Sequence, residues 1–128
     1  MPDPTSNATR WAGVPLVDRR AERRALLVDA AFRLFGDGGE AALSVRSVSR
    51  ESGMNTRYFY ESFRGTDDLL GAVYDRVSAE LAEVVDEAMT EAGPSLRART
   101  RAGMAAVLHF SSADPRRGRI LFTDARAN

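Results

Sequence analysis

The sequence contains no cysteine and no lysine, and it has no long apolar run. Without cysteine the chain forms no disulfide and offers no thiolate to a metal, which suits a cytoplasmic protein. No stretch approaches the roughly eighteen consecutive apolar residues of a membrane-spanning helix, so we expect no membrane association. The first ten residues lack the apolar centre of a secretory signal, and we therefore expect no export.

Every basic side chain is an arginine, and the formal charges cancel. The 18 arginines and 18 acidic residues give a net charge of zero, with +2 on residues 1–64 and −2 on residues 65–128. A neutral chain is not a general nucleic-acid binder, but a DNA-binding helix needs only a local basic face. Arginine can bind a phosphate or a guanine edge through two nitrogens. A compositional bias of the genome would produce the same absence of lysine.

The chain has one histidine, His109, in an apolar stretch. Catalysis or metal binding by histidine needs partner groups within reach. No cysteine or second histidine exists, and the first carboxylate that follows is Asp114. We therefore expect His109 to be a core or pocket residue, and we expect no enzymatic activity, no metal site and no cofactor.

The stretch from residue 44 to residue 63 predicts two short helices joined by a tight turn. Ser44 suits an N-cap, because its hydroxyl can accept a free N–H of the first turn. Gly53 can adopt the positive φ that ends a helix, and Asn55 is suited to cap the next one. Phe59 and Phe63, spaced i and i+4, predict a buried stripe on that second helix.

The other face of the predicted second helix is polar and aromatic. It carries Thr56, Arg57, Tyr58 and Tyr60. A short helix capped at a turn is what a helix-turn-helix motif places in the major groove of DNA. The alternative is an ordinary surface helix of a bundle, with surface tyrosines. Arg57 would then be a solvated side chain rather than a base reader or a phosphate contact.

Helical patterns fill the rest of the chain, which predicts an all-α fold. Residues 1–17 are expected to be a flexible arm. We expect a helix at 18–35 with Asp18 as its N-cap, a long connector helix from a Thr66 cap to Gly93, a helix opened by Pro94 that runs to residue 110, and a last helix within 116–126. The last three helices carry more apolar surface than they can bury on each other, which indicates a missing partner.

Four arginines lie in the first turns of the helix predicted at 18–35. They are Arg19, Arg20, Arg23 and Arg24. Positive charge at a helix N-terminus opposes the helix dipole, so helix stability does not account for them. Contact with phosphate and a plain solvated face both remain open for this cluster.

The order of these features resembles the TetR/AcrR family of bacterial transcriptional regulators over roughly residues 20–75. The matching segments are residues 30–35 at the end of the first helix, 44–48 at the start of the second, 53–55 with Tyr60 and Phe63, Arg64, and 67–70 at the start of the connector. The resemblance implies an all-α fold with a three-helix DNA-binding head and a larger helical body. In the family the body binds a small effector and dimerises.

The resemblance implies a function and a division of the chain. Residues 18–65 would form the DNA-binding domain, with the helix-turn-helix at 44–63, and residues 66–128 a partial effector and dimerisation domain. The protein would be a homodimeric repressor that binds palindromic operator half-sites on double-stranded DNA and is released by an unknown small-molecule effector. His109, with Met104, Leu108 and Phe110, would line the effector pocket.

The residues that the resemblance assigns to DNA are Ser44, Arg46, Asn55, Thr56, Arg57, Tyr58, Tyr60, Arg64 and Thr66. Thr66 stands where the family often has lysine, and Arg57 stands where a small residue is common. The chain also ends inside the expected body, before the usual dimer helices. The alternative function is therefore a truncated helical interaction fragment that binds DNA only weakly and without specificity.

Overall fold

A computed structural model describes residues 16–127 as a chain of helices. Over this range the all-α prediction is confirmed, since every element is helical. The elements are α2 (Leu16–Gly38), the 3-10 turn η1 (Glu40–Ala42), α3 (Val45–Ser52), α4 (Thr56–Ser62), α5 (Thr66–Glu91), α6 (Leu96–Ala113) and α7 (Pro115–Ala127). The predicted arm lies outside the described residues, except for residues 16 and 17, which belong to α2.

Two predicted N-caps are wrong. Asp18 lies inside the first turn of α2, because that helix begins two residues earlier. Thr66 is the first residue of α5, and the capping position is Gly65, which has no side chain to bond. The backbone N–H of Arg64 instead donates to Asp68 Oδ2 at 3.0 Å. This bond ties the residue before Gly65 to the first turn of α5, but it leaves the N–H groups of that turn without a side-chain cap.

The second half of the chain also differs from the prediction at its helix ends. Pro94 does not open α6, because Ser95 is the cap and its hydroxyl accepts a hydrogen bond from the N–H of Ala98 at 3.3 Å. The break between α6 and α7 falls at Asp114. Pro115 then begins α7, where its missing N–H costs no helix hydrogen bond.

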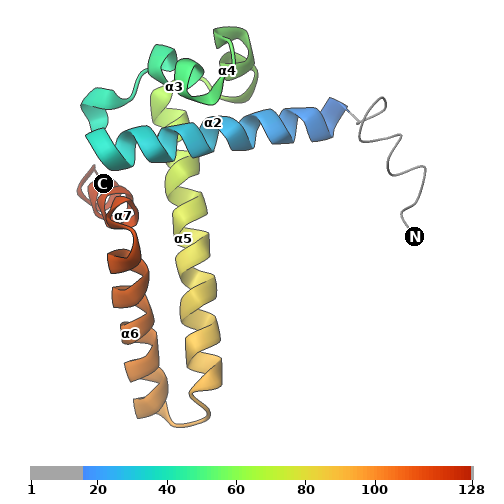
Figure 1. Cartoon of the computed structure of the whole chain (residues 1–128). Coiled ribbons are helices and arrows are strands. Elements are labelled where there is room, and N and C mark those ends of the chain that lie inside the picture. The colour runs from blue at the N-terminus through green and yellow to red at the C-terminus, as the bar shows by residue number, and fades with distance from the viewer. Residues whose placement is uncertain (1–15, 128) are drawn as a thin grey trace.

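The long helices form a hairpin, and the first helix crosses one end of it. Figure 1 shows α5 and α6 side by side and antiparallel, with α2 crossing α5 near its start. The short helices α3 and α4 lie against α2 and the beginning of α5, and α7 packs near the C-terminal end of α2. Helices α3 and α4 therefore lie at the end of the molecule away from the α5–α6 turn.

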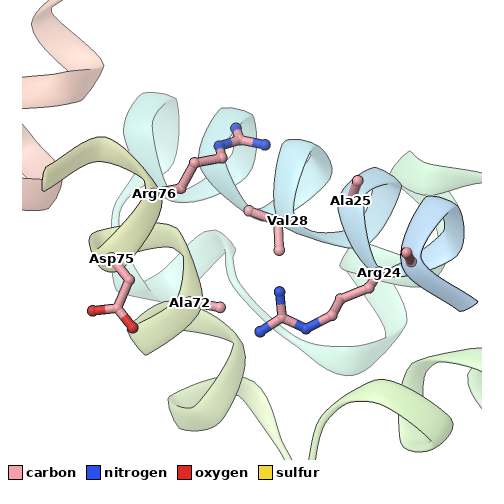
Figure 2. Close-up of a pocket in the computed structure, with 7 residues that line it drawn as sticks. Arg24, Ala25, Val28, Ala72, Asp75 and Arg76 are labelled. Atoms are coloured by element: carbon pink, nitrogen blue, oxygen red, sulfur yellow. The ribbon is translucent and has the colours of Figure 1, made fainter. Parts of the chain in front are cut away.

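An ion pair and a hollow lie beside the crossing of α2 and α5. Arg76 of α5 donates to the carboxylate of Asp29 of α2. Next to this pair lies a hollow of about 430 Å³. Small side chains such as Ala25 and Ala72 leave it open, and Figure 2 shows Arg24 extending from α2 toward Ala72.

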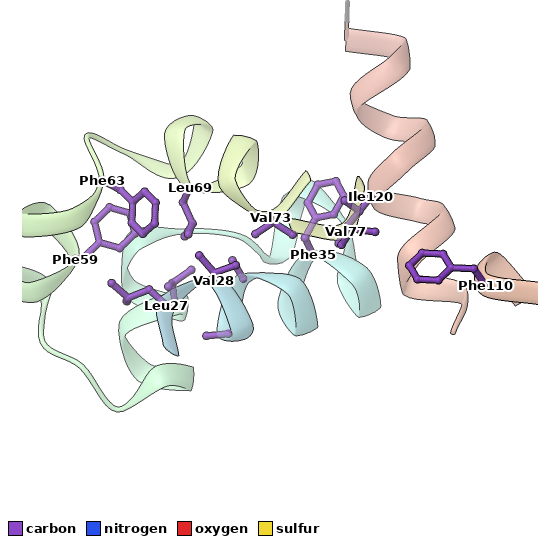
Figure 3. Close-up of a cluster of buried hydrophobic side chains, with 13 residues drawn as sticks. Leu27, Val28, Phe35, Phe59, Phe63, Leu69, Val73, Val77, Phe110 and Ile120 are labelled. Atoms are coloured by element: carbon purple, nitrogen blue, oxygen red, sulfur yellow. The ribbon is translucent and has the colours of Figure 1, made fainter. Parts of the chain in front are cut away.

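One continuous core joins all the α-helices. Figure 3 shows its side chains running from Phe59, Phe63 and Leu69 at one end to Phe35 and Phe110 at the other. Leu69, a residue of α5, is fully buried together with the phenylalanines of α4. The start of the connector helix is therefore part of the same packed unit as α2, α3 and α4.

Helix α7 lies against the end of α2 with little space between them. A Cβ added at Gly36 would lie 2.5 Å from the Cβ of Arg116, so only glycine fits there.

Arg116 also pairs with Asp114 at 2.9 Å and lies 3.9 Å from Asp37. The hydrogen bond from Arg116 lowers the pKa of Asp114. The stabilisation from this pair is present above the ordinary carboxyl pKa of about 4 and is lost as the pH falls through the lowered value.

The outer face of α6 leaves several large apolar side chains in solvent. Leu96, Met104 and Leu108 are exposed and line a shallow groove of about 680 Å³. Phe110 is buried on the other face of the helix, so it does not line this groove. His109 is exposed, and its predicted place in a core or pocket is wrong. Apolar neighbours in the sequence do not determine which face of a helix a side chain occupies.

The turn between α3 and α4 gives a test of backbone conformation. Gly53 ends α3 with φ of 75°, in the left-handed region. We expect Gly53→Ala to lower the free energy of unfolding by about 1–2 kcal/mol, because alanine is strained there. Gly71, within α5, has open space around its Cβ position, so Gly71→Ala should raise stability by about 0.5–1 kcal/mol. Urea unfolding of both variants measures the difference, and equal effects would contradict it.

Candidate nucleic-acid interface

The start of α3 is fixed by two reciprocal hydrogen bonds. The N–H of Ser47 donates to Ser44 Oγ at 3.0 Å, and the N–H of Ser44 donates to Ser47 Oγ at 2.9 Å. The predicted cap at Ser44 is confirmed, and Ser47 completes a capping box that the prediction lacked. Ser44 and Arg46 are consequently held at an exposed helix N-terminus.

Helix α4 has the buried stripe and the cap that the sequence predicts. Phe59 is fully buried and Phe63 nearly so. Asn55 Oδ1 accepts a hydrogen bond from the N–H of Tyr58 at 3.1 Å. The stripe sets the rotation of the helix and the cap sets its start. The outward face of α4 is therefore determined by local sequence.

The residues predicted to contact DNA divide into two groups by exposure. Thr56, Arg57 and Tyr60 face solvent, and the Arg57 side chain is 83% exposed. Asn55 is exposed as well, although its side-chain oxygen already bonds to the helix backbone. Tyr58 is half-buried. Four of the five predicted residues on this segment are thus open to solvent.

Tyr58 is covered by an arginine from α2. The guanidinium of Arg23 lies 4.5 Å from the centre of the Tyr58 ring. Its Nη2 also lies 3.4 Å from Glu61 Oε2, one turn further along α4. Glu61 Oε1 in turn lies 3.9 Å from Arg57 Nε. Sequence reasoning missed this network, because Arg23 and Glu61 are 38 residues apart.

The arginines at the start of α2 have different surroundings. Arg24 lies over the ring of Phe63, with its guanidinium carbon 5.0 Å from the ring centre. Arg23 is held by α4 as described above. Arg20, one turn earlier than both, is exposed. Two members of this cluster therefore connect α2 to α4. Neither of the two predicted alternatives, contact with phosphate or a solvated face, included this role.

Arginine dominates the exposed side of α3 and the loop after α4. Arg46 and Arg50, spaced i and i+4 on α3, are both exposed, as is Arg64 after α4. Arg50 was not among the predicted site residues, although its spacing from Arg46 is the signal that would have found it. The nearby acid Glu51 is paired with Arg33 of α2 at 3.0 Å. Thr66, the last of the predicted residues, is half-buried at the start of α5.

Comparison with known proteins adds a family. Residues 27–73 match the model of a family described as bacterial regulatory proteins, tetR family. This chain therefore contains a segment that is similar to the tetR family. The matched segment starts within α2 and ends within α5, so it includes both short helices and the core that positions them.

Curated relatives of this chain are named as transcription regulators. The HTH-type transcriptional repressor Rv3405c of Mycobacterium tuberculosis is 32% identical over 77 residues, which cover 56% of this chain and 41% of the relative. An HTH-type transcriptional regulator of Haemophilus influenzae is 37% identical over 78 residues, covering 60% of this chain and 38% of the relative. The chain thus spans about two fifths of the length of these relatives.

Solved structures with similar folds carry the names of TetR family or TetR-like regulators. A TetR family transcription regulator from Marinobacter aquaeolei matches with a TM-score of 0.74 and 21% identity, over 84% of this chain and 56% of that one. A TetR-like regulator from Rhodococcus matches with a TM-score of 0.70 and 21% identity, over 79% and 55%. At this identity the likeness shows the fold alone, and it extends beyond the segment of the family match.

Membrane-spanning helices and groups of metal ligands are absent from the described residues. No helix there is long and apolar enough to cross a bilayer. No three histidine or acidic side chains of that range are grouped so that they could hold a metal ion.

The cap of α4 can be tested separately from any ligand. Asn55→Ala should lower the free energy of unfolding by about 1 kcal/mol, because the N–H of Tyr58 loses its acceptor. Asn55→Asp keeps an acceptor and adds a negative charge at a helix N-terminus, so stability should be retained. Thermal unfolding of the two variants checks this. An equal loss for both would show that the side-chain oxygen is not what stabilises α4.

Proposed function

We propose that this protein is a sequence-specific DNA-binding regulator of transcription that places α4 in the major groove. The observation that carries the proposal is the division of α4 into two faces. Phe59 and Phe63 are buried while Thr56, Arg57 and Tyr60 point into solvent. A short helix anchored in this way can insert its outer face into a groove of DNA without disturbing the core.

The charges around α4 support binding to a polyanion despite the neutral chain. Arg46, Arg50, Arg57 and Arg64 are exposed on or beside α3 and α4. The two acids of α3 and α4, Glu51 and Glu61, are paired with arginines of α2. The local surface is therefore basic, and such a surface gains affinity by displacing counterions from phosphates.

The proposed roles follow from position on this surface. Arg57, with Asn55 and Thr56, would meet base edges and the adjacent backbone. Ser44 and Arg46 at the start of α3, Tyr58 and Tyr60 on α4, and Arg64 and Thr66 around the start of α5 would contact phosphates and fix the register. Phosphate contacts position a protein on the duplex, whereas base contacts specify the sequence.

We further propose that residues 18–65 act as the DNA-binding unit and residues 66–128 as part of an effector and dimerisation body. The protein would repress transcription from palindromic operators as a homodimer and would be released by a small-molecule effector. Repression is supported by the printed name of one relative, a transcriptional repressor. Transmission through α5 is supported by Leu69, which is buried among the phenylalanines of α4.

A second candidate function is a helical interaction fragment that binds DNA weakly and without selectivity. The exposed apolar face of α6, with Leu96, Met104 and Leu108, favours it. Binding to a random duplex library at two salt concentrations separates the two candidates. Selection of a defined sequence supports the regulator, whereas weak binding that is lost with salt and selects nothing supports the fragment.

Arg57 is the residue whose replacement tests base reading. Against the duplex that the wild-type protein selects, Arg57→Ala should weaken binding by about 1–3 kcal/mol and relax the preference at one or two base pairs. Fluorescence anisotropy with the selected and a scrambled duplex measures both effects. Arg50→Ala is the matched control, because it removes a similarly exposed arginine from α3 and should weaken both duplexes alike.

The two duplexes decide between the roles of Arg57. A loss that is larger on the selected duplex than on the scrambled one assigns Arg57 to a base. Equal losses on both would refute base reading and leave Arg57 as a phosphate contact. A wild-type protein that selects no duplex from a random library would refute the proposed function itself.

A further inference from the structure

Glu61 lies between two arginines that come from different helices. Its Oε2 is 3.4 Å from Arg23 Nη2 of α2, and its Oε1 is 3.9 Å from Arg57 Nε of its own helix. The side chains of Arg23 and Glu61 are 19% and 31% exposed, whereas that of Arg57 is 83% exposed. One carboxylate thus has a sheltered partner and a partner at the surface.

Arg23 is also fixed by a second contact with α4. Its guanidinium stacks over the Tyr58 ring at 4.5 Å, so ring and carboxylate together hold a single geometry. A planar guanidinium can stack on a ring and bond at its edge at the same time, which an ammonium group cannot do equally well. Arg57, the partner at the surface, lacks a second restraint of this kind. Among the contacts of the described residues, its side chain is restrained by Glu61 alone.

A carboxylate on α4 is a liability at a surface that is to approach phosphates. Uncompensated, Glu61 would repel the DNA backbone, and it would also hold Arg57 back from the duplex. Like charges that meet at an interface repel each other and weaken binding, and proteins use this repulsion to reject wrong partners. Arg23 lies where its positive charge compensates the negative charge of Glu61, whether or not Arg57 is in contact with that carboxylate.

We propose that Arg23 is a positioning residue for DNA recognition, because it neutralises Glu61 and leaves Arg57 available to the duplex. This inference rests on the proposed function. In the free protein the two arginines share Glu61. On DNA, Arg57 leaves for a base or a phosphate, and Arg23 keeps the carboxylate compensated while it holds the Tyr58 ring in place.

The test compares two arginines of α2 that are one turn apart. Arg20→Met and Arg23→Met each remove one positive charge, but Arg20 is exposed at the start of the helix. For the selected duplex, Arg23→Met should raise Kd roughly tenfold more than Arg20→Met, a coupling within the usual range for contacting residues. Arg23→Lys, which keeps the charge, should recover part of the loss. Thermal unfolding shows whether either variant fails to fold.

The decisive measurement is suppression by Glu61→Gln. If Arg23 acts by neutralising Glu61, removing that carboxylate should improve binding about tenfold more in the Arg23→Met background than in the wild-type background. A role of Arg23 in helix packing alone, or as a phosphate contact, gives the same improvement in both backgrounds. That result, or equal losses for Arg20→Met and Arg23→Met, would overturn the proposal.

A measurement without DNA keeps this inference separate from the proposed function. The Nε–H signal of Arg57 reports its contact with Glu61 in ¹⁵N-resolved spectra. Arg23→Met should shift this signal, because Arg57 becomes the sole partner of the carboxylate, and adding Glu61→Gln should abolish the shift. An Arg57 signal that does not respond to Arg23→Met would overturn the sharing of Glu61 even if the protein selects a duplex. A wild-type protein that selects no duplex would instead refute the proposed function.

Discussion

The burial of Phe59 and Phe63 is the constraint on which the surface of α4 depends. Phe59 lies within α4, a helix of only seven residues, and Phe63 is the residue that ends it. With both rings in the core beside Leu69, the rotation of α4 about its axis is fixed. This rotation directs the side chains of Thr56, Arg57 and Tyr60 into solvent. A helix so short has little stability of its own, so this packing and its cap hold it in place.

The same core connects the proposed DNA surface to the rest of the molecule. Leu69 and Val73 belong to α5, yet they are buried with the side chains of α2 and α4. The pair between Arg76 and Asp29 fixes the next turn of α5 to α2. A tilt of the long helix would therefore move α2 and α4 together. This rigidity is what a mechanism of release by an effector requires of the connector.

Sequence reasoning succeeded where the signal is local. The caps at Ser44 and Asn55, the turn at Gly53 and the stripe of Phe59 depend on residues within a few positions of one another, and all four are confirmed. Helical periodicity likewise predicted every α-helix of the described range, although with errors at the ends. The assignment of individual residues to DNA contacts stays a prediction.

It failed where the outcome depends on distant residues or on competition between neighbours. Thr66 was expected to cap the connector, but Gly65 takes the capping position, and Asp68 of the first turn accepts the N–H of Arg64 before the helix. The bond between Arg23 and Glu61 joins residues 38 apart, and no periodicity reveals it. His109 has apolar neighbours in sequence, but the rotation of α6 places it in solvent. Each of these depends on how helices pack rather than on their composition.

The most direct test of the central claim is a map of backbone amide shifts while the purified chain is titrated with the duplex it selects. The account predicts that the largest changes fall at residues 44–46 and 55–60, with smaller ones near residue 64. Changes confined to the exposed face of α6, at residues 96–108, would contradict it. So would a spectrum that does not change at all, because α4 would then not be the surface that meets DNA.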